Sequence, residues 1–227
     1  MRLIKFLTLS VSMTRNQAKF FIKKGRTSVD GKIVTDPDFE LPQSSEVCYD
    51  GKPINILQFK YILLHKPVSY ICASNDDKYT STLKLIPDEI KNNNFQFVNI
   101  LEPNHSGLVL ISDDIRWSSR IYQKVQKKKF IYQVSLSECL NEHLIKKIEE
   151  AYCISLDSED DDKMEVEQNG EYSFLLKISL NKFSRMTGIF SNIGLEVKDI
   201  KLNQIGRLCL GDLEEGKHIE LSEKITI

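Results

Sequence analysis

The chain has 227 residues, a formal net charge of -1 and an apolar share of 41%, so it is long enough for a small module plus a larger core and is not a polycation. No apolar run approaches the length of a membrane span, so we expect no membrane partner. Five scattered cysteines without a CxxC pair and four isolated histidines predict reduced thiols in the cytoplasm and no metal site.

Positive charge is concentrated at the start of the chain. The first 35 residues contain one acid, Asp30, and eight basic residues: Arg2, Lys5, Arg15, Lys19, Lys23, Lys24, Arg26 and Lys32. A basic segment on a near-neutral chain predicts an anionic partner, and the alternative is a solvated basic face. Residues 155–171 have the opposite sign and no periodicity, which predicts an acidic loop.

Two short helices are predicted in this basic segment. Leu3, Phe6 and Leu7 share one face at the i, i+3, i+4 spacing of a helix. Thr14 and Gln17 have the spacing of a capping box, in which the N-cap side chain and the residue three positions later satisfy each other's backbone N–H groups. A second helix is therefore expected to begin at Thr14.

A hairpin is predicted after the second helix. Gly25 is a suitable helix end, and residues 27–34 read as two short strands around the Asp30-Gly31 turn. Residues 42–45 then lead out of the module. We therefore predict a domain at 1–45, a linker at 46–58 and a larger domain at 59–227.

The second predicted helix carries a basic stripe. Arg15, Lys19 and Lys23 recur at every fourth position, and Lys24 and Arg26 follow at the helix end. Such a stripe can follow the phosphates of a nucleic acid without reading its sequence.

This pattern resembles the small RNA-binding module named after ribosomal protein S-four, also called the αL motif. The matching positions are Arg2-Leu3, Lys5-Phe6, Thr14-Arg15, Ala18, Ile22, Gly25, Val29-Asp30-Gly31 and Val34. The resemblance implies RNA binding through Arg2, Arg15, Lys19, Lys23, Lys24 and Arg26.

The larger remainder is predicted to be a mixed α+β domain, because strands outnumber helices and do not alternate regularly with them. The strand-like runs are 59–64, 107–112, 130–136 and 172–178, and the helical candidates are 140–152 and 182–194. Phosphate-binding GxxxxGK, GxSxG and HExxH motifs are absent, so these generic motifs assign no chemistry.

The whole chain resembles the bacterial pseudouridine synthases that modify small-subunit ribosomal RNA. Residues 64–70 are similar to that family's N-K-P-x-G-Y strand, with Ser69 at the usual glycine, and 101–110 are similar to its R-L-D-x-x-T-x-G-L-L signature. Tyr132 fits the K-x-Y-x-V strand, and 181–194 resemble the late E-G-R-Y-H-Q-V-K-R-M-x-x-x-x-G helix. The resemblance implies a small N-terminal RNA-binding module joined to a larger, mainly antiparallel pseudouridine synthase domain.

The resemblance also implies an activity that needs no cofactor. A uridine of 16S ribosomal RNA is flipped into the pocket and isomerised to pseudouridine. Glu102 stands at the position of the catalytic aspartate and Tyr132 at the base-stacking position, while basic residues hold the RNA. The candidates for that binding in the larger domain are Lys66, Lys182 and Arg185.

Several positions depart from the family pattern. Glu102 replaces aspartate, Ile100 replaces arginine, His105 replaces threonine and Phe130 replaces lysine. Residues 187–188, Thr-Gly, stand at two basic positions of the late helix. A catalytically degenerate protein that binds ribosomal RNA and aids ribosome assembly is therefore the alternative to the enzyme. A third hypothesis is a translation factor acting on tRNA or ribosomes. In the leading hypothesis the partner is small-subunit ribosomal RNA and the protein is a cytoplasmic monomer.

Overall fold

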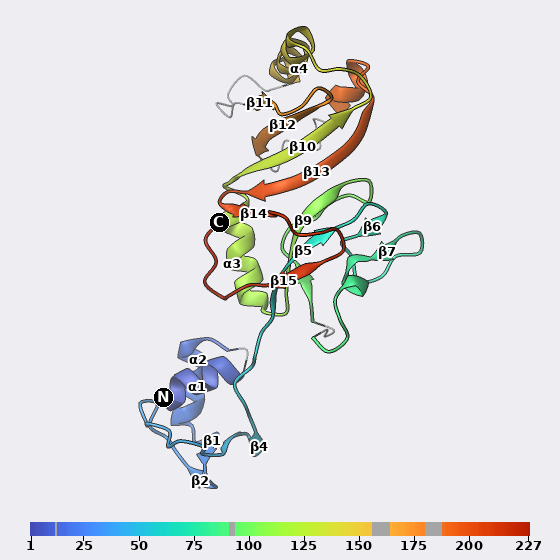
Figure 1. Cartoon of the computed structure of the whole chain (residues 1–227). Helices are drawn as coiled ribbons and strands as arrows, with labels where there is room; N and C mark the ends of the chain where they lie inside the picture. The colour runs from blue at the N-terminus through green and yellow to red at the C-terminus, as the bar shows by residue number, and fades with distance from the viewer. Residues whose placement is uncertain (12, 91–93, 156–163, 180–187) are drawn as a thin grey trace. The chain divides into compact units, whose positions relative to one another are not determined.

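A computed structural model describes residues 1–11, 13–90, 94–155, 164–179 and 188–227, with the side chains of 153–155 excepted. The chain divides into two compact units, Met1–Phe59 and Lys60–Ile227 (Figure 1). In the described parts of the chain, no helix is both long and apolar enough to cross a bilayer.

The first unit begins with the two predicted helices, α1 (Leu3–Ser10) and α2 (Arg15–Lys23). The predicted capping box is present: the Thr14 hydroxyl accepts from the Gln17 N–H, and the Gln17 side chain accepts from the Thr14 N–H at 2.8 Å. Gly25 follows α2 with φ +73°, a conformation that glycine adopts without strain. The buried faces of both helices meet in one small core with residues of the first and third strands.

A four-stranded antiparallel sheet completes this unit, in the order β2-β1-β3-β4. Its strands are β1 (Thr27–Val29), β2 (Lys32–Ile33), β3 (Val47–Tyr49) and β4 (Lys52–Pro53). Asp30 and Gly31 form the predicted turn with φ 47° and 77°, and Asp50 and Gly51 repeat it with φ 52° and 74°. The segment predicted as a linker at 46–58 thus contributes two strands to the module, because its own Asp-Gly turn makes a second hairpin.

The second unit is built on a nine-stranded sheet whose main path is β11-β12-β10-β13-β9-β5-β15. Along the chain its strands are β5 (Tyr61–Lys66), β8 (Gln96–Phe97), β9 (Ser106–Ser112), β10 (Lys129–Leu136), β11 (Glu165–Gln168), β12 (Ser173–Ser179), β13 (Val197–Ile205), β14 (Leu208–Cys209) and β15 (His218–Glu220). Figure 1 shows β12, β10 and β13 running side by side. The pairings are antiparallel except for β9 with β13, so the predicted mixed, mainly antiparallel α+β class is confirmed.

The parallel pairing of β9 with β13 depends on a glycine. Gly107 lies opposite Leu202 with φ +120°, and an added Cβ would lie 2.3 Å from the Leu202 carbonyl oxygen. A side chain does not fit between backbones this close. The approach fixes the start of β9, and therefore the segment that precedes it, against the centre of the sheet.

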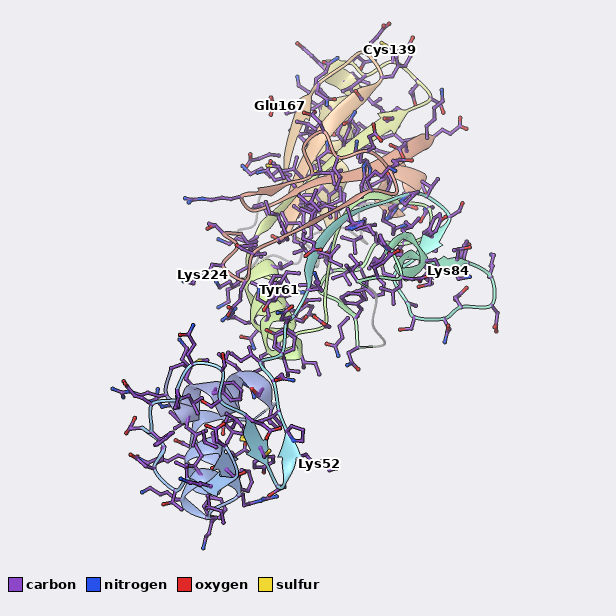
Figure 2. The ribbon with its side chains drawn as sticks, turned by 60° about the horizontal axis from the view of Figure 1, so that its bottom comes forward. Lys52, Tyr61, Lys84, Cys139, Glu167 and Lys224 are labelled. Carbon is purple, nitrogen blue, oxygen red and sulfur yellow. The ribbon has the colours of Figure 1, made fainter. Side chains whose placement is uncertain are left out.

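Further elements of this unit, among its described residues, are the helices α3 (Ile115–Val125) and α4 (Glu142–Ser155), one 3-10 turn at Thr82–Leu85 and a two-stranded ribbon, in which β6 (Tyr70–Ile71) pairs in parallel with β7 (Thr80–Ser81). Asp114 caps α3 by accepting from the N–H groups of Arg116 and Trp117. Trp117 is buried against Tyr61, whose ring centroid lies 4.8 Å away and whose position at the start of β5 is visible in Figure 2.

The strands at 59–64, 107–112, 130–136 and 172–178 and the helix at 140–152 appear within a few residues of the predicted bounds. The predicted acidic loop at 155–171 contains the strand Glu165–Gln168, which pairs with β12 at the edge of the sheet, where one side of a strand remains in water. Residues 156–163 lie outside the described part of the chain. Of the helix predicted at 182–194, residues 188–192 are helical and the part before 188 is not described.

Candidate active site

Glu102 lies on a tight turn between β8 and β9. The His105 N–H donates to the Glu102 carbonyl oxygen at 3.1 Å, with Pro103 at the second position of the turn, where proline's fixed φ is favourable. Leu101 before the turn and His105 after it are buried, whereas Glu102 and Asn104 are exposed. The turn is thus held from inside at both ends and presents the Glu102 carboxylate to solvent.

Asn99 fastens the segment that leads into this turn. Its side-chain amide donates to the Leu108 carbonyl oxygen and its amide oxygen accepts from the Leu110 N–H, both at 2.9 Å. Asn99 is buried, so the two hydrogen bonds are not exchanged with water. The Asn99 side chain thus pairs with the backbone of β9 at a point where residue 99 is no longer part of a β-strand.

A second loop supports the turn from the other side. The Ser69 N–H donates to the Pro103 carbonyl oxygen at 2.6 Å. Ser69 has φ +67°, in the left-handed region that a side chain disfavours. This conformation accounts for the glycine expected at that position, and the serine retains it at a cost in strain.

Lys66, at the end of β5, is fully buried. Its ammonium donates to the carbonyl oxygens of Pro67 and Tyr70, at 2.9 and 2.8 Å, and so closes the loop that carries Ser69. Burial lowers the pKa of Lys66 to about 8, against smaller opposing effects of Cys72 and Glu215. The structure therefore places Lys66 inside the protein, which differs from the RNA-binding role that the sequence predicts for it.

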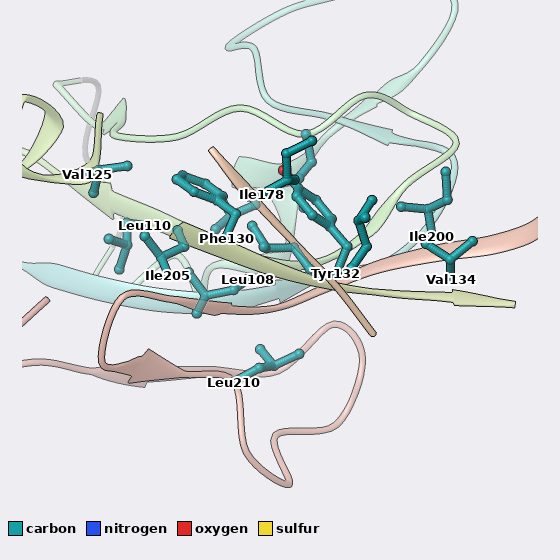
Figure 3. Packing of buried hydrophobic residues seen from close by; sticks show 14 of the residues in the cluster. Leu108, Leu110, Val125, Phe130, Tyr132, Val134, Ile178, Ile200, Ile205 and Leu210 are labelled. Atoms are coloured by element: carbon teal, nitrogen blue, oxygen red, sulfur yellow. The ribbon is translucent and has the colours of Figure 1, made fainter. Parts of the chain in front are cut away.

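Tyr132 lies within electrostatic range of Glu102. It lies on the central strand β10, and its pKa is raised first by burial and then by the negative charge of Glu102. Its ring stacks 6.2 Å from that of Phe130, among the core residues drawn in Figure 3. The ring is only 1% exposed, so in this structure it does not offer a face to a base, which differs from the predicted stacking role.

A pocket of about 390 Å3 opens next to the turn. The residues that line it include Asn104, His105, Phe190, Leu195 and Asp199. Burial lowers the pKa of His105, and the positive charge of Lys66 lowers it further. The Glu102 and Asp199 carboxylates have the opposite effect and raise it. The volume of the pocket falls in the range of small-molecule sites. His105 thus links the turn, the pocket and the internal lysine.

Comparisons with known proteins agree with this architecture. Residues 1–47 match the S4 domain. The chain is 32% identical to the ribosomal small subunit pseudouridine synthase A of Vibrio parahaemolyticus, over 99% of this chain and 97% of that protein. The chain belongs to this pseudouridine synthase family.

Further relatives extend the match. The ribosomal small subunit pseudouridine synthase A of Escherichia coli is 26% identical, over 99% of this chain and 97% of its own length. An uncharacterized RNA pseudouridine synthase of Aquifex aeolicus is 27% identical, over 99% of this chain and 94% of its own length. A solved structure described as pseudouridylate synthase has the same fold, with a TM-score of 0.60, 24% identity and cover of 98% of this chain and 96% of that one.

Within the pseudouridine synthase pattern, the cationic positions around Glu102 hold other residues. Ile100, at the arginine position, is 67% exposed, and Phe130, at the lysine position, is fully buried in the core. Gly188 has open space around its Cα. Thr187, together with the predicted RNA-binding residues Lys182 and Arg185, lies outside the described residues. Among the residues that are described, no group of three His, Cys, Asp or Glu side chains could hold a metal ion.

The S4 domain displays most of the predicted RNA-binding residues. Arg15, Lys19 and Lys23 are exposed along α2, and none of them forms an ion pair with another described residue. Arg2 pairs with Asp38 at 3.0 Å. A shallow pocket of about 360 Å3 between α1 and α2 is lined by Arg2, Arg15 and also Lys5, which the site prediction omitted although it belongs to the basic segment.

Two predicted RNA-binding residues are engaged within the S4 domain. Arg26 donates from Nε to Asp50 at 2.6 Å, and its guanidinium lies over the rings of Phe21 and Tyr49, at 4.5 and 5.1 Å from their centroids. The pKa of Asp50 is lowered by that hydrogen bond. The Lys24 ammonium lies 5.7 Å from the centroid of the Phe20 ring. Arg26 is thus held within its own domain, while Lys24 remains at the surface.

Sequence reasoning missed the Asn99 clamp and the interior position of Lys66. Asn99 carries no motif of its own, and its role follows from the two β9 backbone groups that it pairs. For Lys66, the sequence signal is the apolar run 62–64 shortly before it, and in the structure residues 62–66 are all buried.

Proposed function

We propose that this protein isomerises uridine to pseudouridine in small-subunit ribosomal RNA, with Glu102 as the carboxylate that acts at the sugar. The observation that carries the proposal is the restrained turn: an exposed carboxylate held between two buried anchors, within electrostatic reach of Tyr132 and beside a pocket. The proposed substrate, small-subunit ribosomal RNA, is taken from the names of the relatives. We also propose that the protein is a cytoplasmic monomer.

The reaction is an isomerisation and needs no oxidant or reductant. The bond between the sugar and N1 of the base breaks, the base turns within the pocket, and a bond from C5 to the same sugar carbon forms. C5 loses its hydrogen to solvent and N1 gains a proton. A carboxylate at the sugar carbon lowers the barrier chiefly by proximity and by stabilising the electron-poor sugar.

Glu102 carries one methylene more than the aspartate that the family uses. That methylene moves the carboxylate by about 1.5 Å, and a misplacement of about 1 Å can cost roughly a hundredfold in rate. Glu102 is exposed, so its side chain can adopt a different rotamer when RNA binds. The turn supplies a fixed base for that longer reach.

The test is hydrogen release from uridine labelled with tritium at C5, in a small-subunit ribosomal RNA transcript and in RNA from assembling subunits. The protein should release tritium from one of these, and Glu102→Gln should abolish the release because a neutral amide cannot replace the carboxylate. Glu167→Gln is the matched control, since Glu167 is an exposed acid on the edge strand β11 (Figure 2). No release from either RNA, or full release by Glu102→Gln, contradicts the enzymatic proposal.

A non-catalytic role in ribosome assembly is the second candidate. It is favoured by the absence of family cations at the described positions Ile100 and Phe130 and by the burial of the Tyr132 ring. If the gene is deleted and every pseudouridine of ribosomal RNA remains while small subunits accumulate as precursors, this candidate is supported. Loss of one pseudouridine, restored by wild-type protein but not by Glu102→Gln, excludes it. Crosslinking that recovers mainly tRNA favours a translation factor instead.

A further inference from the structure

Phe20 occupies the solvent face of α2 in the S4 domain. Ala18 and Ile22, two positions before and after it, are fully buried, while the Phe20 ring is 56% exposed. Residues two apart on a helix differ by about 200° in direction, so Phe20 points directly away from the face that packs on the core. The S4 core therefore gives no reason for a large apolar ring at this position.

The surroundings of this ring are cationic. Lys19, Lys23 and Lys24 are exposed within one turn of Phe20, and the sequence of α2 contains no acid. The Lys24 ammonium lies over the Phe20 ring, 5.7 Å from its centroid. An apolar protein surface would have to desolvate these ammonium groups, whereas RNA supplies phosphates for the cations and bases for the ring.

The inner edge of the ring is supported. Phe20 packs edge-on against Phe21, with centroids 5.5 Å apart and an interplanar angle of 71°. Phe21 in turn contacts Tyr49 and lies under Arg26, which pairs with Asp50. Phe20 thus projects from an ordered group of rings and does not depend on RNA to be held in place.

We propose that Phe20 is a stacking platform for an unpaired RNA base, with Lys19, Lys23 and Lys24 holding the phosphates on either side of that base. The S4 domain then binds single-stranded or bulged RNA better than a continuous duplex, whose bases are already stacked on one another. This inference rests on RNA binding by the S4 domain and not on chemistry at Glu102, so the two fail separately.

The experiment measures binding of the full-length protein to a labelled oligoadenylate of about 12 nucleotides and to an RNA duplex of similar length, by fluorescence anisotropy over a salt series. Phe20→Leu should weaken binding to the single strand at least about fivefold, which corresponds to about 1 kcal/mol for one stacked base. It should leave the slope of log affinity against log salt unchanged, because no charge is removed. Phe20→Trp keeps an aromatic face and should bind at least as tightly as the wild type.

Two controls separate stacking from other effects. Lys23→Gln should weaken binding to both RNAs and reduce the salt slope by about 0.7 to 0.9, as expected for one lost phosphate contact. Tyr172→Leu removes an exposed aromatic side chain that follows Glu171 in the second unit, and it should leave binding unchanged. The proposal is overturned if Phe20→Leu binds the single strand like the wild type, if it weakens both RNAs equally, or if Phe20→Trp is as weak as Phe20→Leu.

Discussion

The buried ammonium of Lys66 leads to a prediction about stability and pH. Lys66 is fully buried, and its pKa is lowered from 10.5 to about 8 by burial. The unfolded chain therefore binds a proton at this group between pH 8 and 10.5 when the folded protein does not. Stability rises with pH wherever the unfolded state binds more protons, by about 1.4 kcal/mol per pH unit for one group. The full effect is about 3 kcal/mol.

The prediction is tested with Lys66→Met, which keeps an unbranched side chain only one heavy atom shorter and removes the titration. Between pH 8 and 10.5 the unfolding free energy of the wild type should rise relative to that of Lys66→Met by about 3 kcal/mol, and below pH 8 the difference should be constant. Taking the difference matters, because Cys72 and Tyr132 have raised pKa values and make both proteins less stable at high pH.

Urea unfolding followed by tryptophan fluorescence is the assay, because Trp117 is the single tryptophan and lies in the core of the second unit. Lys84→Met, which removes an exposed lysine of the same unit (Figure 2), should leave the pH dependence of the wild type in place. A constant difference between wild type and Lys66→Met from pH 7.5 to 10.5 would refute the reasoning, since it would mean that the ammonium is solvated.

Three further changes test the geometry of the site. Gly107→Ala should cost more than about 4 kcal/mol of unfolding free energy or prevent folding, because of its φ of +120° and the clash with Leu202. Gly211→Ala, at φ +61° with open space, should cost about 1 kcal/mol in the same urea assay, and equal losses would rule out the backbone clash. Ser69→Gly should raise the unfolding free energy by about 0.5 kcal/mol through relief of its left-handed strain, and a loss in the same measurement would show that the serine hydroxyl is needed. Ile100→Arg combined with Glu102→Asp should release tritium about tenfold faster than either single change, because the arginine is expected to orient the shorter carboxylate. Additive effects would mean that position 100 does not orient the carboxylate.

Much of the S4 domain could be predicted from sequence because its signals are local. The Thr14 capping box, the Gly25 helix end and the Asp30-Gly31 turn each depend on residues within four positions of one another. The boundary was placed too early because β3 pairs with β1 across about 20 residues, a long-range contact that no short motif encodes. In the second unit, the local strand-like and helical patterns predict the overall α+β class. The helix α3 is absent from that prediction.

For the candidate site, the sequence proposes a set of positions but does not specify how exposed each of them is. Glu102 and Tyr132 lie within electrostatic range of each other, although they are 30 residues apart along the chain. Their exposures are opposite to what stacking chemistry would suggest, with an exposed carboxylate and an enclosed ring. Burial depends on the order of strands in the sheet, and β10 lies between β12 and β13, so that residues facing its core side are covered.

The exposure of Glu102 also changes the meaning of the missing cations. In a closed site, a cation both keeps a carboxylate ionised and orients it. Glu102 is exposed, and neither Ile100 nor Phe130 offers a cation that could orient its carboxylate. In this chain, orientation of the turn comes from backbone hydrogen bonds at His105 and Ser69 and from the Asn99 clamp. These contacts fix the main chain and not the exposed Glu102 side chain, so the reaction proposed above requires the RNA to complete the alignment of the carboxylate with the sugar.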